Sequence, residues 1–174
     1  MDNNIIIDQL TPDEALSILR QLAEEDTDLE RKIEQIARRR LTDINAEEIA
    51  HHVYFDLDAL AVEDVWERAG DPNEYIEPGE AAWEMFEETL HPFMREMKRY
   101  QDLSMPLEAK HCCMGILQGI YLFSKESQSE YKNWADDAPS EHFQLVINNW
   151  KESTKDSADI AEIEDFVRRE LSDC

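Results

Sequence analysis

The sequence has few of the residues that make tight turns, since only 4 glycines and 6 prolines occur among its 174 residues. This scarcity argues against a fold built from β-hairpins, and no alternating strand pattern is found along the chain. Four glycines also leave little room for a glycine-rich loop that cradles phosphate groups. The patterns of a nucleophile elbow, a dinucleotide-binding turn and a protein kinase are missing as well, so the most familiar enzyme classes are not predicted.

The sequence also has few cysteines and no long apolar run. The three cysteines are Cys112, Cys113 and Cys174. Neighbouring cysteines on one helix point apart, so no disulfide framework is predicted and a reducing cytoplasm is the natural location. No run reaches the roughly 18 apolar residues that are needed to cross a bilayer. The acidic N-terminus does not resemble a signal peptide.

Positive charge is also in short supply, because 17 lysines and arginines face 41 acidic residues and give a net charge of -24. Such a charge repels phosphate backbones and anionic lipid surfaces, so the sequence predicts neither a nucleic-acid partner nor a membrane partner. The exception is the basic run Arg38 to Arg40, with Arg31 and Lys32 before it. We interpret this run as intramolecular ion pairs at a helix C-terminus, the alternative being a contact with an acidic patch, even on a second copy.

Helical signals recur along the whole chain. Thr11 followed by Pro12 predicts the start of a helix, and Asn45 predicts another start. A long helical pattern covers about residues 80 to 103, and Pro92 inside it is expected to kink or break the helix. A helix is predicted to start after Asp26 or Thr27, and a separate short helix is predicted to end at Gly70. Further helices are predicted over about residues 107–124, 140–152 and 158–171.

The segment HCCMGILQGIYLF, residues 111 to 123, is apolar on most of its helical circumference, as in a helix surrounded by others. Gly115 and Gly119 leave a groove in which a neighbouring backbone can come close. Cys112 and Cys113 are then small buried apolar side chains, not metal or redox groups. The sequence predicts an all-α fold and a single domain over residues 1–174, with 1–9 as a loosely ordered tail. We expect seven to nine helices, packed as antiparallel pairs in a bundle or short superhelical stack around a central buried helix 107–124.

Three Glu-x-x-His pairs give a metal hypothesis, because this pattern supplies ligands in di-iron carboxylate bundles. At least two of the pairs are predicted to face away from the apolar side of their helices, which favours ordinary surface contacts. No cofactor is therefore predicted. The alternative keeps Glu88, His91, Glu108 and His111 as metal ligands; the third pair is Glu48 and His51.

Aromatic residues in polar connecting segments are the candidate binding residues, namely Tyr75, Tyr131 and Trp134, because such residues can anchor an interface. They can also fold back onto the core, an interpretation that is favoured for Trp134. The leading functional hypothesis is a non-catalytic interaction or adaptor protein. Its partner is another protein, with a second copy of the chain as one option.

Two alternatives stay open. The first is a helical-bundle protein that binds a metal or small ligand, with catalysis undecided. The second is a regulator that binds a small molecule in a pocket lined by Met94, Met97 and Tyr121. Neither alternative is supported by a complete motif in the sequence.

The stretches LTPDEALSILRQLAEED, INAEEIAHHVYFDLDALAVEDVWERAG and EPGEAAWEMFEETLHPFM resemble a family of uncharacterised all-helical prokaryotic proteins. The resemblance extends over about residues 10 to 140. It implies a helical fold and a cytoplasmic location, and it implies no activity, cofactor or catalytic residue.

Overall fold

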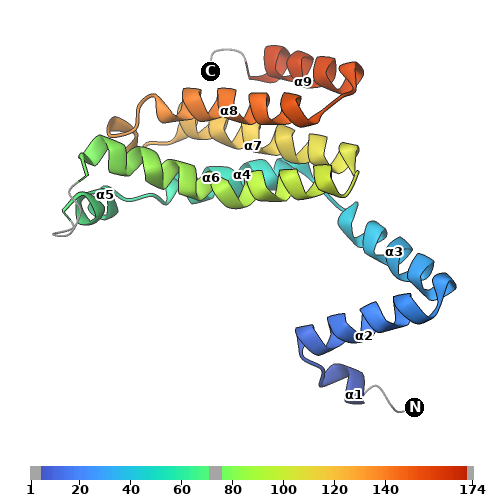
Figure 1. Ribbon diagram of the computed structural model, residues 1–174. Helices are drawn as coiled ribbons and strands as arrows, with labels where there is room; N and C mark the ends of the chain where they lie inside the picture. Colours follow the sequence, from blue (N-terminus) through green and yellow to red (C-terminus); the bar gives the residue numbers. More distant parts are fainter. Residues whose placement is uncertain (1–4, 71–75, 172–174) are drawn as a thin grey trace. The chain divides into compact units, whose positions relative to one another are not determined.

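The computed structural model describes residues 5–70 and 76–171, and within these ranges every regular element is a helix (Figure 1). The all-α prediction is confirmed for this part of the chain. The elements are α1 (Ile5–Asp8), α2 (Pro12–Glu25), α3 (Thr27–Leu41), α4 (Ala46–Asp58), α5 (Val62–Ala69), α6 (Pro78–Asp102), α7 (Pro106–Glu126), the 3-10 helix η1 (Glu130–Asn133), α8 (Ala138–Ser153) and α9 (Ser157–Glu170).

The helices group into two compact units, Met1–Asp43 and Ile44–Cys174. The first unit holds α1 to α3, and α2 packs against α3 within it. The second unit holds the remaining helices. The prediction of one domain over residues 1–174, with residues 1–9 as its tail, stays a prediction. Among the described helices, none is long and apolar enough to cross a membrane.

The helix starts agree with the hydrogen-bonding signals in the sequence. Thr11 caps α2 with a complete capping box, in which the Thr11 backbone N–H donates to the Glu14 carboxylate at 2.9 Å. Asp26 caps α3 and Asn45 caps α4, each by accepting a backbone N–H two residues further on. These contacts form between near neighbours in the sequence, so the local pattern is enough to predict them.

The long helix α6 runs through Pro92 without the predicted break. Proline removes one backbone hydrogen bond and leaves one carbonyl in the previous turn without its donor. Pro92 lies on the exposed side of α6, where water can satisfy that carbonyl. A proline at an exposed position is therefore tolerated in this helix.

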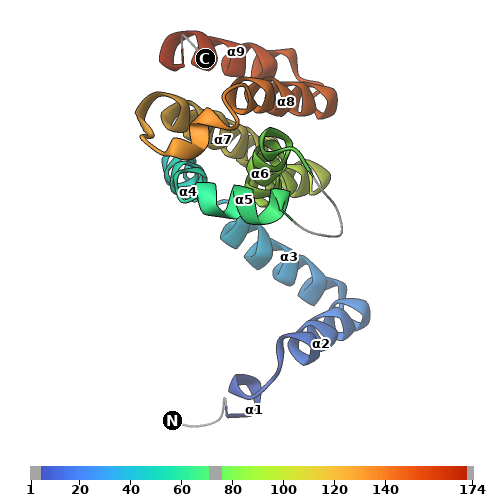
Figure 2. The ribbon, with the colours of Figure 1, turned by 90° about the vertical axis from the view of Figure 1, so that its left-hand side faces the viewer.

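Within the second unit, α7 contacts α4, α6, α8 and α9. In Figure 2 the view runs nearly along α4, α6 and α7, so these three helices are seen end-on. The buried face of α7 includes Ile116, Leu117, Ile120 and Phe123, and Phe123 packs edge-on against Phe86 of α6 at 5.6 Å between ring centroids. Apolar side chains removed from water in this way supply most of the stability of a helical unit.

The two glycines of α7 lie directly against α4. A Cβ atom placed on Gly119 would come within 2.5 Å of the Val53 Cβ, and one on Gly115 within 2.7 Å of the Ile49 Cβ. Real Cβ atoms do not approach so closely, so only glycine fits at these two positions. The predicted groove is confirmed, and α4 is the helix that occupies it.

We predict that Gly119→Ala lowers the free energy of unfolding by about 1–2 kcal/mol. Overpacking costs about 1–3 kcal/mol, and the better helix propensity of alanine returns at most about 1 kcal/mol. Urea unfolding followed by circular dichroism measures the change. Gly79→Ala is the control, since its Cβ would meet nothing closer than the Trp134 carbonyl at 3.6 Å. Equal stability of the Gly119→Ala variant and the wild type would contradict this account of the packing.

Candidate functional site

The cysteine pair of α7 is buried, as predicted for small apolar side chains. Burial raises the pKa of Cys112 to about 12, with the Glu96 carboxylate adding to the effect. Burial also raises the pKa of Cys113, further than that of its neighbour. The Cys112 thiol donates weakly to the Phe93 carbonyl at 3.8 Å. Both thiols therefore stay protonated at neutral pH, and a protonated thiol is a poor nucleophile.

The four residues of the metal hypothesis differ in burial and in partners. Glu88 is exposed and pairs with Arg68, while His91 is exposed on α6. Glu108 is buried on α7 and His111 is half-buried. Within residues 5–70 and 76–171, no group of three or more histidine, cysteine, aspartate or glutamate side chains is placed to hold a metal ion. The described geometry gives this alternative no support.

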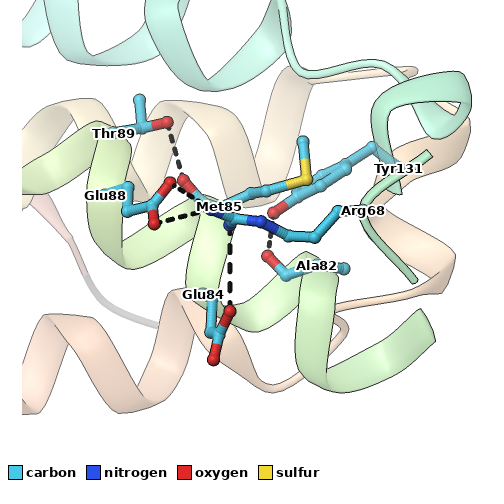
Figure 3. A network of polar contacts seen from close by, with 7 residues as sticks. All are labelled: Arg68, Ala82, Glu84, Met85, Glu88, Thr89 and Tyr131. Carbon is cyan, nitrogen blue, oxygen red and sulfur yellow. Dashed lines mark hydrogen bonds and ion pairs between the residues drawn. The ribbon is translucent and has the colours of Figure 1, made fainter. Parts of the chain in front are cut away.

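The role that Glu88 does play is electrostatic (Figure 3). The Arg68 guanidinium of α5 donates to both Glu88 carboxylate oxygens, at 2.7 and 2.9 Å, and lies 3.9 Å from the Glu84 carboxylate. Hydrogen bonding to Glu88 raises the pKa of Arg68. Because Glu84 and Glu88 both belong to α6, their ion pairs with Arg68 connect α5 to α6.

The candidate binding residues have different surroundings. Tyr131 is fully buried, and its hydroxyl donates to the Ala82 carbonyl of α6 (Figure 3), so its side chain has no exposed surface for a partner in this structure. Trp134 is half-buried and packs edge-on against Trp66 of α5 at 4.9 Å between ring centroids, which agrees with the interpretation that it folds back. Tyr75 lies outside the described residues. The prediction that these residues bind a partner stays a prediction.

A hollow between α6 and α8 lies where the small-molecule hypothesis expects a pocket. Met94 and Met97 line a shallow depression of about 520 Å³, which adjoins a smaller one of about 130 Å³ at Met94 and His91. Tyr121 is not among the walls of either, so the pocket with all three residues stays a prediction. His142 lines the smaller one; its Nδ1 bonds the Ala138 carbonyl at 2.9 Å, and its ring packs against Trp83 and Phe86.

The largest feature that the sequence did not identify is the exposed apolar surface of the unit Met1–Asp43. Neither α2 nor α3 has a buried residue, although the leucines and isoleucines of each helix lie on one side of it. Exposed fractions reach 46% at Leu16 and 49% at Ile36. The periodicity of the sequence shows one apolar face on each helix, and within this unit the packing of α2 on α3 leaves the faces uncovered. The exposed large apolar residues of α2 and α3 are Leu16, Ile18, Leu19, Leu22, Leu29 and Ile36.

We predict that Cys112 and Cys113 resist alkylation in the folded protein. In a Cys174→Ser variant at pH 8, only about one Cys112 thiol in 10,000 is ionised at a pKa near 12. Mass spectrometry after iodoacetamide treatment should find neither cysteine modified until urea unfolds the chain. Rapid labelling of either cysteine in the folded state would show that α7 is not packed as described.

Comparison with known proteins finds no match: no family model, no curated protein and no solved structure is similar enough to this chain to be assigned. This outcome is consistent with the resemblance to an uncharacterised family, and the described part of the chain is helical, as that resemblance implies.

Proposed function

We propose that the chain is a non-catalytic interaction protein, and that its contact surface is the apolar face of the α2–α3 hairpin. The observation that supports this proposal is the lack of any buried residue in either helix, despite one continuous apolar face on each. Helices of this length gain most of their stability by burying such a face. Open apolar faces of this kind are typical of surfaces that bind another protein.

The partner that fits this surface best is a second copy of the chain. Two hairpins built from helices of 14 and 15 residues can cover one another as a four-helix bundle. A symmetric dimer needs a surface that complements itself, and α3 provides one. Its first turn carries Asp28 and Glu30, and its last turn carries Arg38 to Arg40. In an antiparallel pair of α3 helices, the acidic turn of each copy lies opposite the basic turn of the other.

The basic side chains of α3 are also short of partners. Arg31 and Arg38 pair with acids of their own helix. Lys32, Arg39 and Arg40 have no ion pair within the described part of the chain, although acids outnumber bases by 41 to 17 in the sequence. Unpaired cations on so acidic a protein support a contact with an acidic surface, and the second copy supplies one. The free thiols of α7 support a reducing compartment such as the cytoplasm for this interaction.

We predict that the wild-type chain is a dimer in light scattering after size exclusion, and that Leu19→Glu with Ile36→Glu makes it a monomer. Each substitution buries a charge in place of about 1.5–3 kcal/mol of apolar contact. Dimer affinity should therefore fall by at least about 100-fold. Leu107→Glu is the matched control, because Leu107 is an exposed leucine of α7 in the other unit, and this variant should stay dimeric.

Three outcomes count against the proposal. A wild-type chain that stays monomeric up to several hundred micromolar would exclude the second copy as partner. Dissociation of the Leu107→Glu control would place the interface elsewhere. Loss of the helical circular dichroism signal of the second unit in the double variant would mean that the substitution acts through misfolding.

We further predict that the charges of α3 steer this pairing. Arg39→Glu with Arg40→Glu gives a mostly acidic helix, and Asp28→Lys with Glu30→Lys gives a mostly basic one. Each variant alone should dimerise about tenfold or more weakly than the wild type, because like charges then face one another. An equimolar mixture should form mixed dimers, detectable by native mass spectrometry. Equal dimerisation of all three chains would show that charge plays no part.

A further inference from the structure

The short helix α1, Ile5–Asp8, carries two of the most exposed large apolar side chains in the described part of the chain. Ile6 is 80% exposed and Ile7 is 61% exposed. Residues 9–11 connect α1 to α2, and a connection of this length spans at most about 15 Å. The two isoleucines therefore lie near the start of α2.

The unit Met1–Asp43 does not cover these isoleucines. Its closest helix packing is that of α2 on α3, and the apolar faces of α2 and α3 are themselves uncovered within the unit. Burial of apolar surface is the main source of stability when helices pack. Cover for α1 and for the hairpin therefore comes only from outside this unit.

The proposed dimer brings such a surface to α1. The α2 helix ends and the α3 helix begins at the turn around Asp26, so the start of α2 lies at the opposite end of the hairpin. When two α3 helices pair antiparallel, the turn of each copy lies at the open end of the other copy. Two exposed leucines lie near that turn, Leu22 at 37% and Leu29 at 36%.

We infer that α1 of each copy packs on the turn end of the partner's hairpin, with Ile6 and Ile7 against the partner's Leu22 and Leu29. The inference rests on the proposed dimer and adds a second contact to it. By symmetry this contact forms twice, once at each end of the bundle. The α1 helix carries one charge, that of Asp8, so the contact is apolar, in contrast to the charge pairing of α3.

The first test measures the dimer affinity of the whole chain by sedimentation equilibrium. Ile6→Gln with Ile7→Gln removes the apolar side chains without adding charge, and it should weaken the dimer at least about tenfold. The loss should be similar at about 0.05 M and about 0.5 M salt, because salt screens charge pairs and not apolar contacts. Phe55→Gln is the matched control, since Phe55 is 62% exposed on α4 in the other unit, and it should dimerise like the wild type.

The second test is a disulfide between two chains. One chain carries Ile7→Cys and the other carries Leu29→Cys, both with Cys174→Ser, and the cysteine pair of α7 is buried. Mild oxidation of the mixture should link the unlike chains, because a disulfide needs Cα atoms within about 7 Å. Leu16→Cys replaces Leu29→Cys in the control. Leu16 lies about 9 Å further from the turn than Leu22, so it should link far more slowly.

The outcomes separate this inference from the proposed dimer. A monomeric wild type would remove both. A wild type that dimerises with the same affinity as Ile6→Gln with Ile7→Gln would overturn the inference alone, and so would equal linking of Ile7→Cys to Leu16→Cys and to Leu29→Cys. A disulfide closed within one chain that carries both Ile7→Cys and Leu29→Cys would place α1 on its own hairpin, against the exchange between copies.

Discussion

The close contact between α7 and α4 is the constraint on which the second unit depends. Because Gly115 and Gly119 have no side chains, the backbone of α7 approaches Ile49 and Val53 at a distance that any Cβ would prevent. Each glycine costs up to about 1 kcal/mol of helix propensity. The packing that follows must offset this cost, and it places α7 where α6, α8 and α9 can also reach it. The burial of the cysteine pair is a consequence of the same arrangement.

Charged contacts hold the outer helices to this core. The Lys110 ammonium of α7 is nearly buried and lies 2.8 Å from Asp159 and 2.6 Å from Glu162, both on α9. The ion pair of Arg68 with Glu88 connects α5 to α6. The Ser127 hydroxyl, which follows α7, donates to the Asp58 carboxylate of α4 at 2.5 Å. The nearly buried Lys110 pair adds little net stability, because burying a charge costs much of what the pair returns. All of these contacts join different helices of the second unit or the segments beside them.

The sequence predicts what depends on near neighbours and on helical periodicity. The cap at Thr11 and the glycine groove of α7 could be predicted, because each follows from residues within one or two turns. The surroundings of Tyr131 could not, because its hydroxyl bonds a carbonyl 49 residues earlier in the chain. The hollow beside Trp150 was equally hidden, since its walls combine residues 101–109 with residues 150–159. For the hairpin, the periodicity showed an apolar face, but not whether another helix covers it.

The open hairpin has a consequence for how this protein responds to its surroundings. A segment of 43 residues without buried side chains in its two main helices lacks a core of its own. Helices of 14 and 15 residues are only marginally stable in water when nothing covers them. Folding of this segment is then thermodynamically linked to occupancy of its apolar side. In the dimer proposed above, the helix content of this segment would rise with protein concentration.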